Sequence, residues 1–102
     1  MRYRGKVFFA WADPSLSHHS HVETLKGGAK LDVLVRESVT GAVQLFIGIY
    51  EVTGLPRIEE SYDSCPGETI TTALLWGTGR GRHLAQSTKG NDFRYPVSIS
   101  IR

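Results

Sequence analysis

Three histidines lie within four residues of this sequence, in the stretch SHHSH (17–21), and Glu23 follows them. Neutral imidazoles are common metal ligands. On an extended chain His19, His21 and Glu23 point to the same side, but a tetrahedral site needs a fourth ligand and supporting hydrogen bonds. No H-x₃-H or HExxH spacing is present. We therefore expect a solvated polar segment and predict no metal site; metal binding by His18, His19 and His21 is the alternative that stays open.

Cys65 is the single cysteine, so no internal disulfide can form, and a cytoplasmic setting is expected. It precedes a predicted helix, where the helix dipole would stabilise a thiolate. A phosphatase-like nucleophile needs an arginine six residues further on, and Thr71 stands there. No acid–base partner is fixed by the sequence. We expect Cys65 to be a half-buried capping residue of a non-enzymatic protein; a nucleophile at Cys65 is the alternative.

The segment GTGRGR (77–82) alternates small and basic residues. A dinucleotide-binding fingerprint needs G-x-G-x-x-G directly after a strand, but here Arg82 stands where the third glycine belongs. A phosphate-binding Walker loop needs Gly-Lys-Ser/Thr, which is missing. The segment therefore predicts neither a phosphate site nor a cofactor.

The same segment belongs to a predicted helix over about residues 67–86. Five residues recur at helical spacing on one face: Ile70, Leu74, Gly77, Gly81 and Leu84. A glycine inside a helix costs about 1 kcal/mol relative to alanine. Gly77 and Gly81 therefore predict a close approach of the helix to the sheet, over Trp11 or Phe9, while Gly79 lies on the other side.

Alternation of apolar and polar residues predicts strands over 2–12, 30–38, 42–52, 57–63 and the C-terminal 93–101. Residues 13–29 leave two alternatives open, a short helix after Pro14 or a strand that Gly27-Gly28 turns into the next one; the hairpin is favoured. The fold class is α+β, an antiparallel sheet of four to five strands with one long helix across one face. The whole chain, 1–102, is predicted to be a single domain.

One helix covers only one face of such a sheet. If it lies on the face of Val7, Phe9, Val33, Val35, Leu45 and Ile47, the opposite face stays uncovered. That face carries Phe8, Leu34, Phe46 and Tyr50, and Arg4, Lys6 and Arg36 fringe it. Exposed apolar patches of this kind mark interfaces. We therefore expect a protein that acts stoichiometrically through this face, on a protein partner or by self-association as a homodimer.

The charge balance is mild, with 12 basic and 10 acidic residues and a net charge of +2. Nucleic-acid binding is an alternative only through local clusters, formed by Arg2, Arg4 and Lys6 with Arg80, Arg82 and His83. The basic residues near the helix end would also simply complement its dipole. The apolar runs, about six residues at most, are too short for a membrane span.

Three strands followed by a helix resemble the double-stranded-RNA-binding domain. That domain opens with a helix and has a lysine cluster at the start of its last helix, whereas this chain opens with a predicted strand and its helix begins CPGETITT. In size and layout the chain is similar to small α+β inhibitors of phages and mobile elements, such as anti-CRISPR proteins, without a shared motif. That similarity implies a second alternative, inhibition of a host system.

Overall fold

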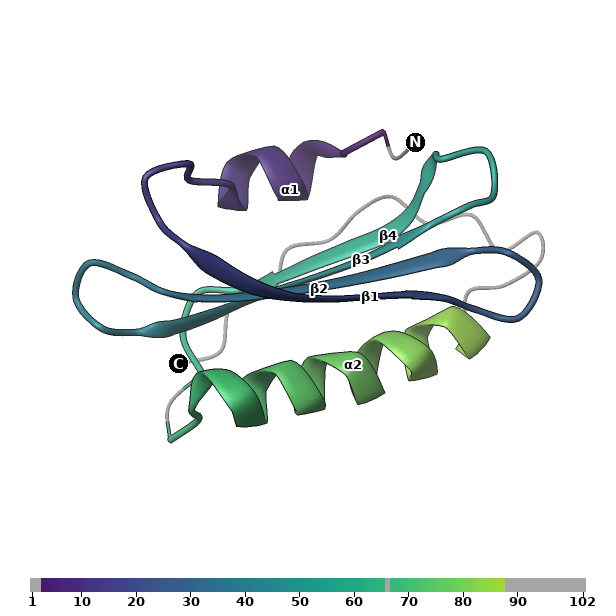
Figure 1. The fold of residues 1–102 in the computed structure, drawn as a ribbon. Coiled ribbons are helices and arrows are strands. Elements are labelled where there is room, and N and C mark those ends of the chain that lie inside the picture. Colours follow the sequence, from purple (N-terminus) through teal and green to yellow (C-terminus); the bar gives the residue numbers. More distant parts are fainter. Residues whose placement is uncertain (1–2, 66, 88–102) are drawn as a thin grey trace.

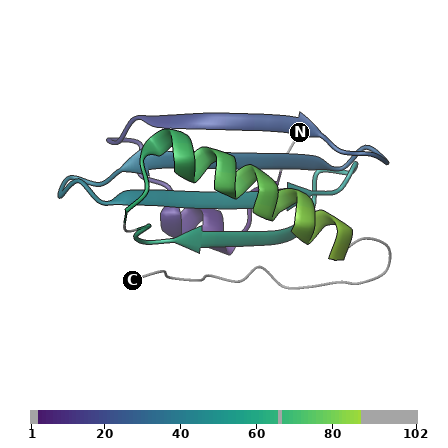
Figure 2. The ribbon, with the colours of Figure 1, turned by 90° about the horizontal axis from the view of Figure 1, so that it is seen from below.

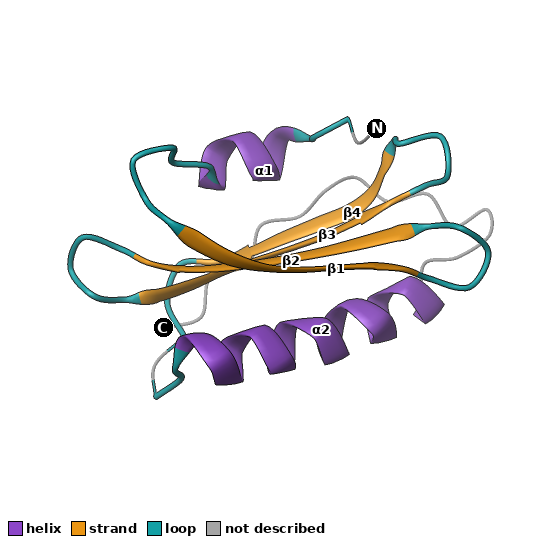
Figure 3. Cartoon of the chain, viewed as in Figure 1, coloured by secondary structure: helices purple, strands orange, loops and turns teal. Residues whose placement is uncertain are grey.

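The computed structural model describes residues 3–65 and 67–87. The elements follow the order α1 (Lys6–Trp11), β1 (His18–Thr24), β2 (Lys30–Glu37), β3 (Val43–Tyr50), β4 (Pro56–Tyr62) and α2 (Ile70–Ser87). They form three layers, with the sheet between α1 on one face and α2 on the other (Figures 1 and 3). The predicted α+β fold with one long helix on a sheet face is confirmed.

The four strands form an antiparallel meander in the order β1-β2-β3-β4. The favoured hairpin in residues 13–29 is confirmed, because β1 pairs with β2 from His18↔Arg36 to Thr24↔Lys30. Gly27 and Gly28 turn the chain between them with φ angles of 92° and 97°, which side chains rarely allow. The strands predicted over 30–38, 42–52 and 57–63 coincide with β2, β3 and β4. The fifth predicted strand, 93–101, lies outside the described residues.

α2 crosses the strands obliquely and covers one face of the sheet (Figure 2). Alternate residues of β2 and β3 point toward it, since side chains alternate between the faces of a strand. The fully buried members of this core are Leu31, Val33, Val35, Leu45, Ile47 and Ile49. Among the described residues, no helix is long and apolar enough to cross a membrane.

Gly77 and Gly81 are the points of closest approach between α2 and the sheet. A Cβ atom at Gly77 would lie 2.7 Å from Val33 Cγ1 and 2.8 Å from Leu45 Cδ1, and one at Gly81 would collide with Leu31. A Cβ at Gly79 would meet nothing within 4 Å. The predicted faces of the three glycines are confirmed. The prediction that Gly77 and Gly81 approach Trp11 or Phe9 is wrong, because both aromatic residues belong to α1, on the opposite side of the sheet.

The strand predicted over residues 2–12 is wrong, because this segment contains the helix α1. Val7 and Trp11 share a strand face in the alternating pattern, but they are also four residues apart and so share a helix face. Both are buried against Leu34 and Phe46 on the sheet. In so short a run the two periodicities coincide, and packing decides between them. The first element is thus a helix, as in the double-stranded-RNA-binding domain, but four strands follow and α2 contains no lysine.

α1 has no capping side chain of its own, since its N-cap residue is Gly5. The cap comes from Glu59 on β4, which is fully buried. The Gly5 N–H donates to Glu59 Oε2 at 2.9 Å, and the Phe8 N–H donates to Glu59 Oε1 at 3.1 Å. The carboxylate satisfies two amides at the helix N-terminus and complements the dipole there. The position of α1 therefore depends on β4.

Candidate functional site

The sheet face expected to be uncovered is buried beneath α1. Phe46 and Tyr50 are fully buried, Leu34 is buried, and Phe8 is partly buried against them. The rings of Phe8 and Phe46 meet edge to face, with centroids 5.3 Å apart. The expectation of an exposed sheet face was therefore wrong, because a segment predicted as a strand folds over it as a helix.

Two of the three basic residues expected to fringe that face make intramolecular contacts instead. Arg4 Nη1 lies 2.7 Å from Asp32 Oδ2 and donates to Tyr50 Oη at 3.0 Å. The guanidinium of Arg36 stacks 3.8 Å from the centroid of the Trp11 ring. The third, Lys6, is exposed on α1. Arg4 and Arg36 thus fasten the N-terminal segment to the sheet.

Tyr50 and Glu59 complete the polar network under α1. The Tyr50 hydroxyl donates to Glu59 Oε2 at 2.5 Å. Its ring lies over Gly48, where a Cβ atom would come within 2.6 Å of Tyr50 Oη. Burial and this hydrogen bond raise the pKa of Tyr50 well above its ordinary value, so the phenol remains a neutral donor. The hydrogen bond from Tyr50 thus holds the Glu59 carboxylate in place as the cap of α1.

Arg80, one of the residues assigned to nucleic-acid binding, is paired with a buried carboxylate. Its Nε and Nη2 donate to the two carboxylate oxygens of Glu60 at 3.2 and 3.0 Å. The Tyr62 hydroxyl donates to Glu60 Oε1 at 2.7 Å. Burial and this hydrogen bond raise the pKa of Tyr62 to about 12. Arg80 therefore joins α2 to β4.

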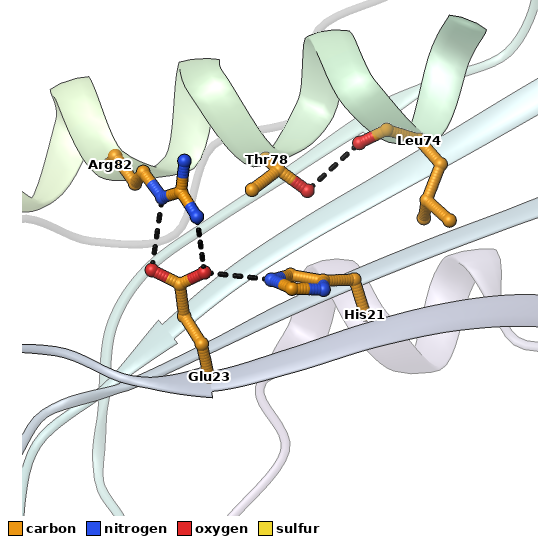
Figure 4. A network of polar contacts seen from close by, with 5 residues as sticks. All are labelled: His21, Glu23, Leu74, Thr78 and Arg82. Atoms are coloured by element: carbon orange, nitrogen blue, oxygen red, sulfur yellow. Dashed lines mark hydrogen bonds and ion pairs between the residues drawn. The ribbon is translucent and has the colours of Figure 1, made fainter. Parts of the chain in front are cut away.

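Arg82 is also ion-paired, on the other flank of α2 (Figure 4). Its Nε and Nη2 donate to Glu23 at 3.0 and 2.8 Å, and His21 Nε2 lies 2.7 Å from the same carboxylate. The hydrogen bonds from Arg82 and His21 hold the pKa of Glu23 at about 2. His83 is exposed, and Arg2 lies outside the described residues. Of the predicted basic cluster, Arg80 and Arg82 thus have their charges balanced within the chain.

The histidine cluster is spread along the sheet edge. His18 and His19 are exposed on β1, and only His21 is drawn to Glu23. Within residues 3–65 and 67–87, no three His, Cys, Asp or Glu side chains are grouped as metal ligands. The three histidines therefore form no ligand set in this part of the chain.

Cys65 is buried in the core beneath α2. Its backbone N–H donates to Val43 O at 2.9 Å, and its carbonyl accepts from Glu68 N at 3.1 Å. Burial, with Glu68 nearby, raises the pKa of the Cys65 thiol. The expected stabilisation of a thiolate was wrong, because α2 begins only at Ile70 and the thiol packs among apolar side chains.

A hollow of about 770 Å³ lies among the β1–β2 turn, the β3–β4 turn and the end of α2. Four of its lining residues form two ion pairs, Arg82 with Glu23 and Arg57 with Glu51. Its charges are therefore largely balanced, which does not favour an anionic or cationic ligand.

Two large apolar side chains, consecutive in the sequence, are exposed on α2. Leu75 is 70% exposed and Trp76 is 45% exposed. The Trp76 ring meets Tyr62 edge to face, with centroids 5.3 Å apart, which fixes its orientation. Sequence reasoning missed this pair. The signal was present, since neither position falls on the 70-74-77-81-84 stripe that faces the sheet.

No family model, curated protein or solved structure matches this chain.

Proposed function

We propose that this is a non-enzymatic interaction protein that binds a protein partner stoichiometrically through the outer surface of α2. The observation that carries the proposal is the exposure of Leu75 and Trp76 on a helix whose opposite face is locked to the sheet. Tryptophan is enriched in binding hot spots. A helix that presents neighbouring apolar side chains suits a partner with an apolar groove.

The ion pairs that attach α2 to the sheet support this proposal. Arg80 fastens one flank of the helix to Glu60 on β4, and Arg82 fastens the other to Glu23 on β1. A surface that is already ordered before binding loses less conformational entropy when a partner docks. The side chain considered for catalysis supports it too, because the Cys65 thiol is buried and its pKa is raised.

Affinity purification from the source cells with the wild type, Leu75→Asp and Val39→Asp tests this proposal. Val39 is a matched control because it is 90% exposed on the β2–β3 turn, away from α2. We expect one partner at equal stoichiometry with the wild type and Val39→Asp, lost with Leu75→Asp. A partner retained by Leu75→Asp, or none from the wild type, would contradict the α2 surface. Phe46 and Tyr50 are unsuitable targets, because their burial means that aspartate there would unfold the protein.

The two alternatives stay predictions. Inhibition of a host system would use the same kind of stoichiometric interface. Nucleic-acid binding predicts an affinity that falls steeply with salt. A fluorescence anisotropy titration with DNA and RNA at low salt tests it, and binding that survives Arg80→Gln and Arg82→Gln would exclude these arginines as the phosphate contacts.

A further inference from the structure

We infer that two copies of this protein pair through β1, in antiparallel orientation, and join their two four-stranded sheets into one continuous sheet. This inference goes beyond the proposed function and uses another surface, the edge of the sheet rather than the outside of α2. Figure 2 shows β1 as one border of the sheet, with α2 crossing the strands on one side.

The outer edge of β1 presents hydrogen-bonding groups of the backbone. The Leu25 N–H donates to Ala29 O at 2.7 Å at the end of the β1–β2 hairpin. Hydrogen-bonded pairs alternate along an antiparallel ladder, and this ladder has a regular register. The N–H and C=O groups of His18, Ser20, Val22 and Thr24 therefore point away from β2. In the described chain, no strand pairs with this side of β1.

β1 also lacks most of the features that protect sheet edges from pairing. Proline, lysine, bulges and inward-pointing charges usually block such edges. β1 contains neither proline nor lysine, and its pairing with β2 shows no bulge. Its one carboxylate, Glu23, is paired with Arg82. β4, the opposite edge, begins at Pro56 and has a bulge beside it. Of the two edges that the described residues form, β1 is the one that is open to pairing.

Only one antiparallel register pairs all seven residues of β1 with those of a second copy, and it is centred on His21. That register places His18 opposite Thr24, His19 opposite Glu23 and Ser20 opposite Val22. The pairs Ser20–Val22 and His18–Thr24 then contain the outward backbone groups, so they are the hydrogen-bonded pairs. The register thus agrees with the hydrogen-bonding pattern within each hairpin.

The side chains of this register are complementary. His19 and Glu23 form a non-hydrogen-bonded pair, in which side chains approach most closely. Each imidazole can donate to the carboxylate of the other copy, and the two-fold axis repeats the contact. On the other face, Val22 is 52% exposed in one copy and would be covered by its neighbour across the axis. Because β1 is complementary to itself in this register, the strand that pairs with its outer edge is β1 of a second copy.

Disulfide trapping tests both the dimer and its register. His21 would lie opposite itself in a non-hydrogen-bonded pair, so His21→Cys in a Cys65→Ser background should form a covalent dimer under mild oxidation. Val39→Cys, in the same background, is the control because it is more exposed than position 21 and lies on the β2–β3 turn rather than on β1. We expect cross-linking at position 21 and none at position 39. Equal cross-linking at both positions, or none at position 21, would overturn the inference.

Analytical ultracentrifugation of the protein gives the second measurement. We expect a dimer for the wild type and a monomer with unchanged near-ultraviolet circular dichroism for Val22→Pro, which removes an outward N–H. His19→Asp should weaken the dimer about tenfold by placing like charges opposite each other, and His18→Asp much less. A wild-type monomer, or a dimer that all three variants retain, would overturn the inference. Leu75→Asp should leave the dimer intact, which separates this inference from the proposed α2 surface.

Discussion

Glu59 accepts three hydrogen bonds, and two of them, from backbone amides of the N-terminal segment, join that segment to the sheet. The third comes from Tyr50 on β3. Because the Glu59 carboxylate is fully buried, removing either carboxylate oxygen would leave an N–H or O–H donor that water cannot reach to replace the lost hydrogen bond. Arg4, bound to both Asp32 and Tyr50, adds positive charge to the same network. The network is therefore best understood as the attachment of α1 rather than as a reactive site.

Glu59→Gln should lower the free energy of unfolding by roughly 1–3 kcal/mol, measured by urea denaturation. The amide nitrogen would face the Phe8 N–H at one oxygen position and the Gly5 N–H at the other. Either orientation places a donor against a donor. Glu68→Gln, on an exposed residue, is the matched control and should change little. Equal stabilities of Glu59→Gln and the wild type would contradict the capping role.

We expect the Tyr62 hydroxyl to contribute less to the free energy of unfolding at alkaline pH. Burial and the hydrogen bond to Glu60 raise its pKa to about 12 from an ordinary value of 10.0, so the folded state favours the neutral phenol. The contribution of the hydroxyl is complete below the ordinary value and is lost as the pH rises toward the folded value. The difference in unfolding free energy between the wild type and Tyr62→Phe should therefore shrink over that interval. A constant difference would show that the phenol is not shielded.

At the scale of elements, α2 departs from ordinary helix composition because of where it lies. Its interior glycines at 77 and 81 reduce helix propensity, but they allow the backbone to rest on Leu31, Val33 and Leu45. The glycine at 79 has no such neighbour.

Substitutions of these glycines should therefore separate by face. Gly79→Ala should be neutral or stabilise the protein by up to about 1 kcal/mol, because it only improves helix propensity. Gly77→Leu and Gly81→Leu should each destabilise it by roughly 1–3 kcal/mol or more, because the added atoms overlap β2 and β3 side chains. Thermal unfolding followed by circular dichroism measures all three. Similar effects at the three positions would contradict the packing described for α2.

The sequence predicted those elements whose signals are local. The helical stripe from Ile70 to Leu84 and the alternation in β2 and β3 lie within single segments, so the helix, these strands and the glycine faces could be recognised. α1 could not, because its capping carboxylate lies more than fifty residues away, on β4. That error also misplaced the candidate interface, since α1 covers the face that was expected to be open. Leu75 and Trp76 were not predicted as a surface, because the helical stripe identifies the buried positions of α2 and says nothing of what its exposed positions bind.

At the scale of the whole molecule, the sheet separates two apolar layers that share the same strands. Trp11 belongs to the α1 layer and Trp76 stands on α2, so each layer has its own fluorescent reporter. Residues of β2 and β3 contribute to both layers, which predicts that neither layer persists without the other.

Urea denaturation of Trp76→Phe and Trp11→Phe tests this coupling, because each variant leaves one tryptophan to report on one layer. We expect the transition followed by fluorescence in each variant to coincide with that followed by far-ultraviolet circular dichroism. Loss of the Trp11 signal at lower urea than the strand signal would instead show that α1 detaches by itself.

The dependence of α1 on Glu59 has a consequence for synthesis on the ribosome. A six-residue helix is too short to persist alone in water, and the carboxylate that caps this one belongs to a strand translated much later. In the nascent chain, the segment with Val7, Phe8 and Trp11 therefore stays unfolded until β4 has emerged from the ribosome. The segment translated before all the strands is among the last to take its final shape, and it closes one layer of the molecule as it does so.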